Sequence, residues 1–353
     1  MGNVVYGDIS PRTAAFVVTE LLKRGMPYLI LEKFGQAKPI STRSSKTIKF
    51  RRYFLSMAGG TYSPASYFNT DSQSNFDPSS KILTEGVTPA ATTLESADYE
   101  ATLVQRGDRT VITDVVTDTH EDNVLKEAIE ILGEQAAIIL EKARFNVVKA
   151  GTNVVYANGD ARASVNTVFS AAVQRQATRT LERQLAKPIT SIVKSTADFG
   201  TESIAPAFVA ICHPDLKYDI SRAAGFVPVE KYGAVTAFEG EFGKISDVRY
   251  IATTIFAPWL GGGAASGTNV IETSSAADVY PILFLARDAY GLVPLKGKDS
   301  ITPMVVSPKP SDSDPMAQRG HVAWKAMTTT IILNDSFMVR GEVACTADAY
   351  LTD

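Results

Sequence analysis

The longest regular pattern in the sequence predicts an amphipathic helix over residues 121–150. Its polar residues, among them Glu141 and Arg144, fall opposite the apolar ones, and we expect that polar side to face solvent. Gly151 can end the helix in a left-handed conformation. Thirty residues at a rise of ~1.5 Å give a rod about 45 Å long. The apolar residues recur at spacings of four and three, which places them on one face: Leu125, Ile129, Leu132, Ala136, Ile139 and Ala143.

Two weaker helical patterns and several short apolar runs complete the expected elements. Residues 10–24 form a helix candidate with Ser10 as N-cap, and residues 166–186 form another that Pro188 terminates. The apolar runs are short enough to be strands. They cover residues 207–212, 280–287 and 328–333, and residues 337–345 alternate into a final strand.

A long hairpin is predicted between residues 46 and 114. Residues 46–54 alternate imperfectly between apolar and polar, and residues 99–112 form a second strand candidate. The segment between them is rich in Gly, Ser, Thr, Asn and Pro, and has no periodicity. Such a long irregular segment is uncommon inside a compact domain, so we interpret it as the tip of a projecting hairpin. Its aromatic residues either dock on another molecule or fold back onto their own domain. They are Tyr62, Tyr67, Phe68 and Phe76.

Charge is distributed unevenly along the chain. The first 52 residues carry ten Lys and Arg against three acids, whereas the whole chain has a net charge of −3. Three interpretations stay open for this basic segment: contact with nucleic acid, contact with an acidic surface of a neighbouring copy, or a solvated arm. The basic residues at the start of the hairpin are therefore candidate contacts to DNA or to another subunit. They are Lys46, Lys49, Arg51 and Arg52.

The residues that could carry chemistry do not form a catalytic or metal-binding pattern. The three histidines are isolated, and none has a second ligand at metal spacing. Cys212 and His213 are adjacent, but neighbours on a strand point to opposite faces, which disfavours a nucleophile and base pair there. The run 240–246 lacks the spacing of a phosphate loop and is interpreted as a turn between strands. We therefore expect no enzyme activity, no cofactor and no metal.

Membrane insertion and secretion are also not indicated. No apolar run approaches the ~20 residues that a bilayer-spanning helix needs. Polar residues interrupt the first apolar stretch, so it does not match a signal peptide. Two widely separated cysteines are no disulfide framework, and both are expected to be buried. The protein is expected to fold in a cytosol.

Four short motifs occur in an order that resembles a known family. TEGVTP at 84–89 lies before a strand that ends in VITD at 111–114, and the long amphipathic helix follows. RGHVAWK at 319–325 and IILND at 331–335 complete the pattern. Together they resemble the major capsid proteins of tailed bacteriophages, of the N-four type found in podophages. That family has the Hong Kong 97-type capsid fold.

The resemblance implies an α+β fold with four parts. Residues 1–45 would be an N-terminal arm and 46–115 an extended loop built as a long β-hairpin. Residues 116–160 and 301–353 would form a peripheral domain around the spine helix, and 161–300 an axial domain. Residues 57–81 are longer than the usual loop tip of the family, which predicts additional contacts there.

The resemblance also implies partners and a location. The chain would assemble with itself as pentamers and hexamers into an icosahedral shell around packaged double-stranded DNA, in the virion capsid, after synthesis in the cytoplasm of a host bacterium. A portal, a separate scaffolding protein and a decoration protein are the further partners it suggests. The alternatives are an encapsulin-like nanocompartment shell of the same fold, which would hold cargo protein, and an enzyme that uses Cys212 and His213.

Overall fold

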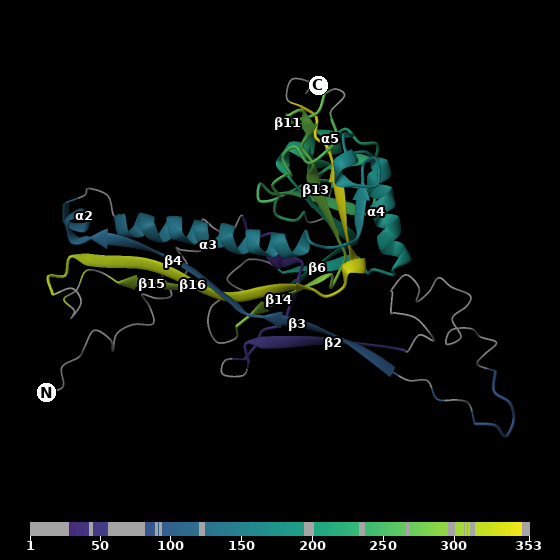
Figure 1. The fold of residues 1–353 in the computed structure, drawn as a ribbon, viewed down its shortest axis with the longest axis horizontal. Coiled ribbons are helices and arrows are strands. Elements are labelled where there is room, and N and C mark those ends of the chain that lie inside the picture. The colour runs from purple at the N-terminus through teal and green to yellow at the C-terminus, as the bar shows by residue number, and fades with distance from the viewer. Residues whose placement is uncertain are drawn as a thin grey trace.

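Two β-sheets set at an angle to each other form the body of the protein, and a two-stranded ribbon projects from it (Figure 1). The structure is a computed structural model. It describes residues 28–41, 45–55, 82–88, 91, 94–119, 124–193, 201–232, 237–265, 269–295, 301–306, 308, 310 and 315–347. The helix predicted over 10–24 lies outside these residues.

The five-stranded sheet is organised around one long central strand, β16 (Arg319–Ile332). β4 (Val104–Thr113) pairs with it along one edge. β15 (Ile301–Val306) and β14 (Tyr290–Pro294) pair one after the other along the opposite edge. The short β1 (Gln36–Ala37) continues the sheet by parallel pairing with β14.

The predicted long helix is present as α3 (Val124–Val148), which lies along the five-stranded sheet (Figure 1). A short helix, α2 (Asp114–Thr119), links it to β4. The apolar face of α3 packs on Val322 and Trp324 of β16, and the Trp324 indole donates to Gln135 Oε1 at 3.3 Å. The helix is thus confirmed, and its side toward the sheet is buried: Ile129, Leu132, Ala136 and Leu140.

The polar side of α3 differs from the expectation at its C-terminal end. Glu141 is fully buried and Arg144 is 7% exposed, although both were expected to face solvent. The cause is a segment distant in sequence, because η3 (Leu31–Lys33) and its neighbours cover this side of the helix. Gly151 also differs, because its φ is not positive; an added Cβ would instead meet Met338 and Asp335.

The second sheet has eight strands and carries most of the buried core. The helix predicted over 166–186 is the shorter α4 (Ala171–Arg183), and it packs on one face of this sheet. The small elements around it are η5 (Arg162–Ser164), η6 (Pro214–Leu216), α5 (Lys217–Ser221), η7 (Val229–Lys231), β11 (Glu272–Thr273), β12 (Ala276–Ala277) and η8 (Asp335–Phe337). The strands of the sheet are β5 (Val154–Tyr156), β17 (Met338–Val343), β13 (Tyr280–Leu285), β7 (Thr201–Cys212), β10 (Val248–Ala252), β9 (Glu241–Ile245), β8 (Phe226–Pro228) and β6 (Ile189–Val193), which pairs with β7.

Both faces of the eight-stranded sheet are covered, which explains its continuous apolar strands. Every residue of β13 is buried. One face contacts α4 through Phe284 and Tyr250. The other packs Ile211 and Leu283 against Phe145 near the end of α3 and against the arm residues near Leu31.

The projecting ribbon consists of β2 (Thr47–Leu55) and β3 (Leu94–Thr102), paired antiparallel from Thr47↔Thr102 to Leu55↔Leu94. The predicted hairpin is therefore present, but its second strand is divided at Leu103. This buried residue donates its N–H to Lys46 O at 2.9 Å, and the following strand β4 leaves the ribbon to pair with β16. Burial of Leu103 explains the division, because its side chain packs in the core under the ribbon.

Strand pairing crosses the expected division of the chain at five strands. β1 (within 1–45), β4 (within 46–115) and β14 (within 161–300) join the five-stranded sheet. β5 (within 116–160) and β17 (within 301–353) join the eight-stranded sheet. The chain thus passes between the two bodies more often than a simple division by sequence implies. None of the helices in the described part of the chain is long and apolar enough to span a bilayer.

Candidate assembly surfaces

The outer face of the ribbon carries a ladder of two ion pairs between directly opposed residues. Lys49 Nζ lies 2.5 Å from Glu100 Oε1. Arg51 contacts Asp98 with both arms of its guanidinium, Nε to Oδ1 at 2.7 Å and Nη2 to Oδ2 at 2.9 Å. The hydrogen bond from Arg51 lowers the pKa of Asp98, and the bond to Glu100 raises the pKa of Lys49. Both basic charges are therefore neutralised within the ribbon.

Among the side chains that the structure describes, those of the inner face of the ribbon that pack on the body lie at its base. Phe50, Ala101 and Leu103 are buried with Val293 of β14. Lys38 Nζ lies 5.0 Å from the centre of the Phe50 ring. Farther out, on the face that carries the ladder, Tyr53 and Leu94 are 66% and 71% exposed, so this part of the ribbon presents apolar groups to its surroundings.

The predicted contact residues are only partly described by the structure. Lys46, Lys49 and Arg51 lie on the ribbon or directly before it, and only Lys49 and Arg51 belong to the ladder. Arg52 lies in β2, but its side chain is outside the described part. Four further candidates lie outside the described residues altogether: Tyr62, Tyr67, Phe68 and Phe76.

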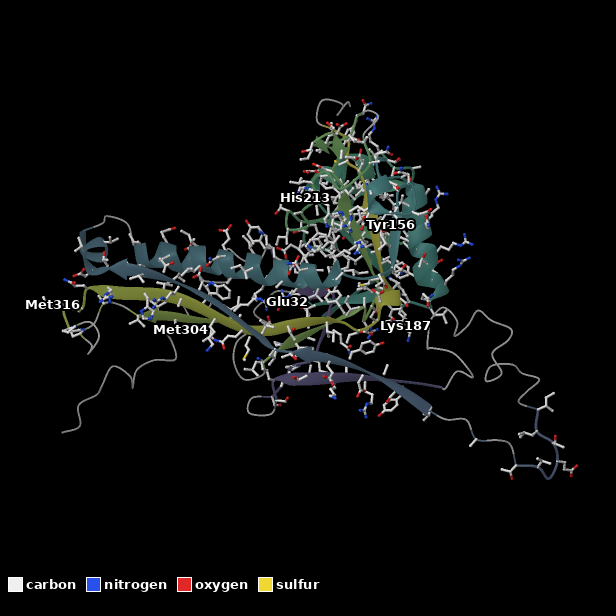
Figure 2. The ribbon with its side chains drawn as sticks, in the orientation of Figure 1. Glu32, Tyr156, Lys187, His213, Met304 and Met316 are labelled. Carbon is white, nitrogen blue, oxygen red and sulfur yellow. The ribbon has the colours of Figure 1, made fainter. Side chains whose placement is uncertain are left out.

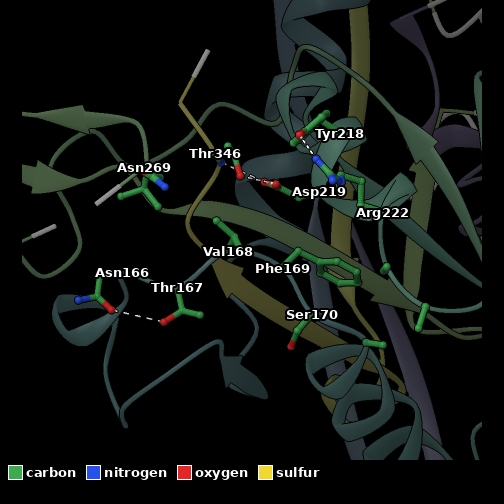
Figure 3. Close-up of a pocket in the computed structure, with 14 residues that line it drawn as sticks. Asn166, Thr167, Val168, Phe169, Ser170, Tyr218, Asp219, Arg222, Asn269 and Thr346 are labelled. Atoms are coloured by element: carbon green, nitrogen blue, oxygen red, sulfur yellow. Dashed lines mark hydrogen bonds between the residues drawn. The ribbon is translucent and has the colours of Figure 1, made fainter. Parts of the chain in front are cut away.

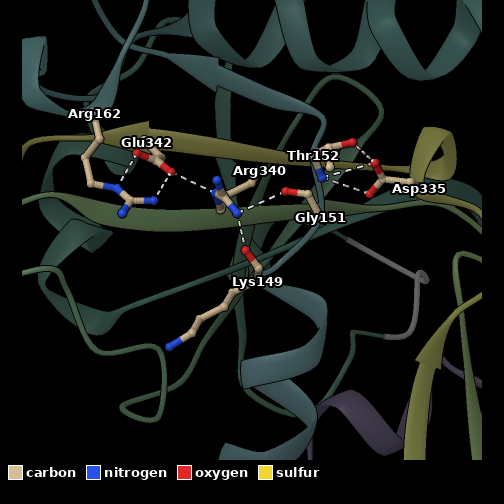
Figure 4. Close-up of polar contacts among 7 residues, drawn as sticks. All are labelled: Lys149, Gly151, Thr152, Arg162, Asp335, Arg340 and Glu342. Atoms are coloured by element: carbon tan, nitrogen blue, oxygen red, sulfur yellow. Dashed lines mark hydrogen bonds and ion pairs between the residues drawn. The ribbon is translucent and has the colours of Figure 1, made fainter.

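A buried polar cluster, which we call the joint, connects the end of α3 to β17 (Figure 4). Glu342, fully buried, accepts two hydrogen bonds of 2.8 Å from Arg162 and one of 2.8 Å from Arg340. Arg340 also donates to the carbonyls of Lys149 and Gly151. The Arg162 guanidinium stacks 3.7 Å above the Trp259 ring. The joint thus fixes the C-terminal end of the spine helix to the eight-stranded sheet.

A second polar cluster holds the arm segment, residues 28–34, against α3. Glu141 Oε1 accepts the N–H groups of Ile30 at 3.0 Å and Leu31 at 2.6 Å. Arg144 contacts Glu141 at 3.2 Å and Glu32 at 3.1 Å. Sequence reasoning missed this cluster, because residues 26–45 have no periodicity and the partners are about a hundred residues apart.

The distal end of the five-stranded sheet exposes apolar side chains. Met304 and Met316 lie there, 39% and 75% exposed (Figure 2). Strand register places Val111 and Val306 on either side of His321 on the same sheet face. Contiguous exposed apolar groups favour burial against another protein. The sequence signal that could have indicated this surface is the apolar run Met-Val-Val at residues 304–306.

An open groove of about 710 Å³ lies beside the start of α4 (Figure 3). Its buried carboxylate, Asp219, is already bound by the backbone N–H and the hydroxyl of Thr346. Within the described residues no group of three His, Cys, Asp or Glu side chains could hold a metal ion. Cys212 is fully buried with its thiol toward Ile251 O, while His213 contacts Asp215 at 3.0 Å, so the two do not act together.

A family model described as phage capsid protein matches residues 97–339 of this chain. The chain belongs to the phage capsid protein family. The matched segment runs from the ribbon through the spine helix and into β17, and therefore includes both sheets. As a phage capsid protein, the chain is a structural subunit of the icosahedral shell of a virion and is not an enzyme.

Solved structures agree with this assignment at the level of the fold. The capsid of Ralstonia phage GP4 is similar with a TM-score of 0.62 and 12% identity, over 89% of this chain and 88% of that one. The Cyanophage Pam1 capsid has a TM-score of 0.58 and 14% identity, over 92% and 93%. These matches establish the Hong Kong 97-type α+β fold of this capsid protein.

An encapsulin has the same fold. The SrpI encapsulin from Synechococcus elongatus PCC 7942 is similar with a TM-score of 0.52 and 10% identity, over 97% of this chain and 93% of that one. It is a weaker match than the phage capsids above, and the family model is that of phage capsid proteins. No curated protein sequence matches this capsid protein.

Proposed function

We propose that copies of this chain associate as pentamers and hexamers of the N-four podophage type, and that the closed shell encloses a double-stranded DNA genome. The observation that carries the proposal is the ribbon β2–β3. It projects beyond its own body, and the buried residues among its described side chains, Phe50 and Ala101, lie at its base. A projecting element with exposed apolar groups gains its burial from another copy.

The domain division remains a proposal with modified boundaries. Residues 1–45 would be the arm and 46–103 the extended loop. The peripheral domain would contain the five-stranded sheet and α3, including β14, and the axial domain would contain the eight-stranded sheet, including β17. Strand pairing supports these assignments, because hydrogen-bonded strands of one sheet move together.

For the basic residues of the ribbon, we propose contacts between subunits in place of contacts with DNA. Lys49 and Arg51 already face Glu100 and Asp98, so this part of the ribbon presents little net charge to a phosphate backbone. Their ion pairs are exposed and can exchange partners with a neighbouring copy at small cost. Lys46 and Arg52 are included as further candidates, as are the aromatic residues Tyr62, Tyr67, Phe68 and Phe76.

Additional partners are proposed on the basis of the resemblance. A portal would occupy one vertex, a separate scaffolding protein would assist assembly, and a decoration protein could bind outside. The exposed surface around Met304 and Met316 is a protein-contact surface available for any of these or for another copy.

Expression of the full chain, alone and with a co-expressed scaffolding protein of the same phage, tests the proposed assembly. We expect capsomers or closed shells in electron micrographs and sedimentation far above that of a 38.0 kDa monomer. Monomers under both conditions would contradict the proposal. Extracting nucleic acid or protein from purified shells then distinguishes a genome container from an encapsulin-like compartment, because the latter would hold cargo protein.

The role of the ribbon charges has a separate test. Neutralising Lys46, Lys49, Arg51 and Arg52 to Gln should prevent shell formation if they bind neighbouring subunits. Empty shells that fail to package DNA would instead indicate contact with the genome. Neutralisation also breaks the ion pair within the ribbon. The charge-swapped variant Arg51→Asp with Asp98→Arg keeps that internal ion pair, and it is therefore the matched control for its loss.

A further inference from the structure

Glu141 is the most enclosed acid on α3, and the groups around it come from distant parts of the chain. Its Oε1 accepts the N–H groups of Ile30 and Leu31, and its Oε2 lies 3.2 Å from Arg144 Nη1. Burial raises the pKa of this carboxyl, while Arg144 and the two N–H groups lower it. A carboxylate that accepts several hydrogen bonds in the interior holds its donors in one arrangement.

The same turn of the arm is fixed from two other directions. The hydroxyl of Tyr290, at the start of β14, donates to Leu31 O at 2.5 Å. Arg144 Nη2 lies 3.1 Å from Glu32 Oε2. The N–H groups, the carbonyl and the acidic side chain of this short turn are thus bound by side chains of α3 and of the five-stranded sheet. Buried backbone groups outside regular structure need such partners.

The arm segment also reaches the eight-stranded sheet. Lys33 Nζ lies 2.6 Å from Glu239, in the loop before β9, and the Phe34 ring meets Phe238 edge to face at 5.3 Å. Leu31 is fully buried in the core beneath that sheet. Gly35 follows where an added Cβ would lie 2.6 Å from the Tyr290 ring. The segment therefore lies between the spine helix and the two sheets and contacts all three.

We propose that Glu141 is a positioning residue for shell assembly: by fixing residues 28–34, it sets where the N-terminal arm leaves the body and the angle between α3 and the eight-stranded sheet. The assembly consequence rests on the proposed function, whereas the positioning itself is a property of the single chain. Shell closure requires every copy to present its contact surfaces at defined angles, so a variable arm position would produce variable particles.

Amide hydrogen exchange on the unassembled full-length chain tests the positioning. In Glu141→Ala we expect exchange at Ile30 and Leu31 to become faster by roughly 100-fold, because two buried N–H groups lose a charged acceptor. Glu127→Ala removes an exposed acid from the same helix and should leave these two amides unchanged. Unchanged exchange in Glu141→Ala would overturn the proposal.

A variant that keeps the side-chain volume covers the case in which Glu141→Ala does not fold. Glu141→Gln retains one acceptor oxygen but loses the charge, and we expect roughly tenfold faster exchange at the same amides. If Glu141→Ala is unfolded and the two amides exchange at the wild-type rate in Glu141→Gln, the role of Glu141 is merely structural. That result would overturn the proposal.

Particle geometry tests the assembly consequence. Under conditions where the wild-type chain and Glu127→Ala form uniform shells, we expect Glu141→Ala to give mixed diameters and open particles in cryo-electron micrographs. Uniform shells from a variant with fast exchange would overturn the role in assembly. If the wild-type chain itself forms no shells, the proposed function fails, and the exchange result still decides the positioning.

Discussion

The ribbon and the joint use the same chemistry, an Arg that binds a carboxylate with two hydrogen bonds, in opposite environments. Arg51 and Asp98 are exposed on the ribbon, whereas Glu342 at the joint is fully buried under Arg162 and Arg340. An exposed pair is screened by water and contributes little to stability. A buried pair is costly to break, because the remaining charge has no water to solvate it. The difference suggests that the ribbon can exchange partners during assembly while the joint keeps its geometry.

The largest effect is expected from removal of the buried acid. Glu342→Ala leaves Arg340 and Arg162 without their shared acceptor, and we expect a loss of about 3–5 kcal/mol in the free energy of unfolding. Urea unfolding followed by circular dichroism measures it. Glu272→Ala, in the exposed part of β11, is the control and should change stability by less than ~0.5 kcal/mol. A similar small change in both variants would remove the contrast between joint and ribbon.

Cys212 offers a chemical probe of the same contrast. Burial raises the pKa of its thiol to about 12, so at pH 8 only roughly one thiol in ten thousand is ionised. We expect a maleimide to label Cys212 only when the eight-stranded sheet opens. Labelling should become at least about 100-fold faster in Glu342→Ala and stay at the wild-type rate in Arg51→Ala. Cys345→Ser in all variants restricts the readout to one thiol.

A smaller effect is expected at the backbone of the joint. In Gly151→Ala the added Cβ would meet the end of the Met338 side chain and lie 2.8 Å from Asp335 Oδ1. Both atoms are the ends of side chains that can move, so the cost should be at the low end of such crowding, about 1 kcal/mol. Thermal unfolding measures it, with Glu272→Ala, a change at an exposed residue, as the comparison. Equal melting temperatures for Gly151→Ala and wild type would show that the joint can adjust.

The smallest effect is expected on the ribbon. Arg51→Ala removes both hydrogen bonds to Asp98, yet the melting temperature of the unassembled chain should remain within experimental error at physiological salt. The yield of shells from the same preparation should fall if the ribbon binds neighbouring copies. A clear drop in melting temperature would mean that the ladder stabilises the single chain and is not held for exchange.

Local patterns predicted the regular elements well. The stripe from Leu125 to Ala143 identified the spine helix. The strands β13 and β17 were readable as an apolar run and an alternating segment. Helix periodicity is visible in sequence because it depends on neighbours within a few turns. The division at Leu103 was not readable, because it depends on the core beneath the ribbon.

Partners distant in sequence explain what local patterns could not predict. Which acids lie opposite Lys49 and Arg51 depends on the register of the hairpin. Because 38 residues separate β2 from β3, the sequence alone does not define this register. The burial of Glu141 depends on a segment whose own sequence has no pattern. The resemblance to capsid proteins rested on the order of short motifs, because a shell subunit has no catalytic residues by which its function could be identified.

The long strand β16 has a mechanical consequence. It begins at Arg319 and runs the full length of the five-stranded sheet. The chain then continues directly through η8 into β17 of the eight-stranded sheet. A load that pulls the two sheets apart would therefore act along covalent bonds, while the rows of hydrogen bonds beside β16 would be sheared together and not opened one at a time. A container under internal pressure benefits from such a continuous tie within each subunit, because its resistance does not depend on any single weak contact.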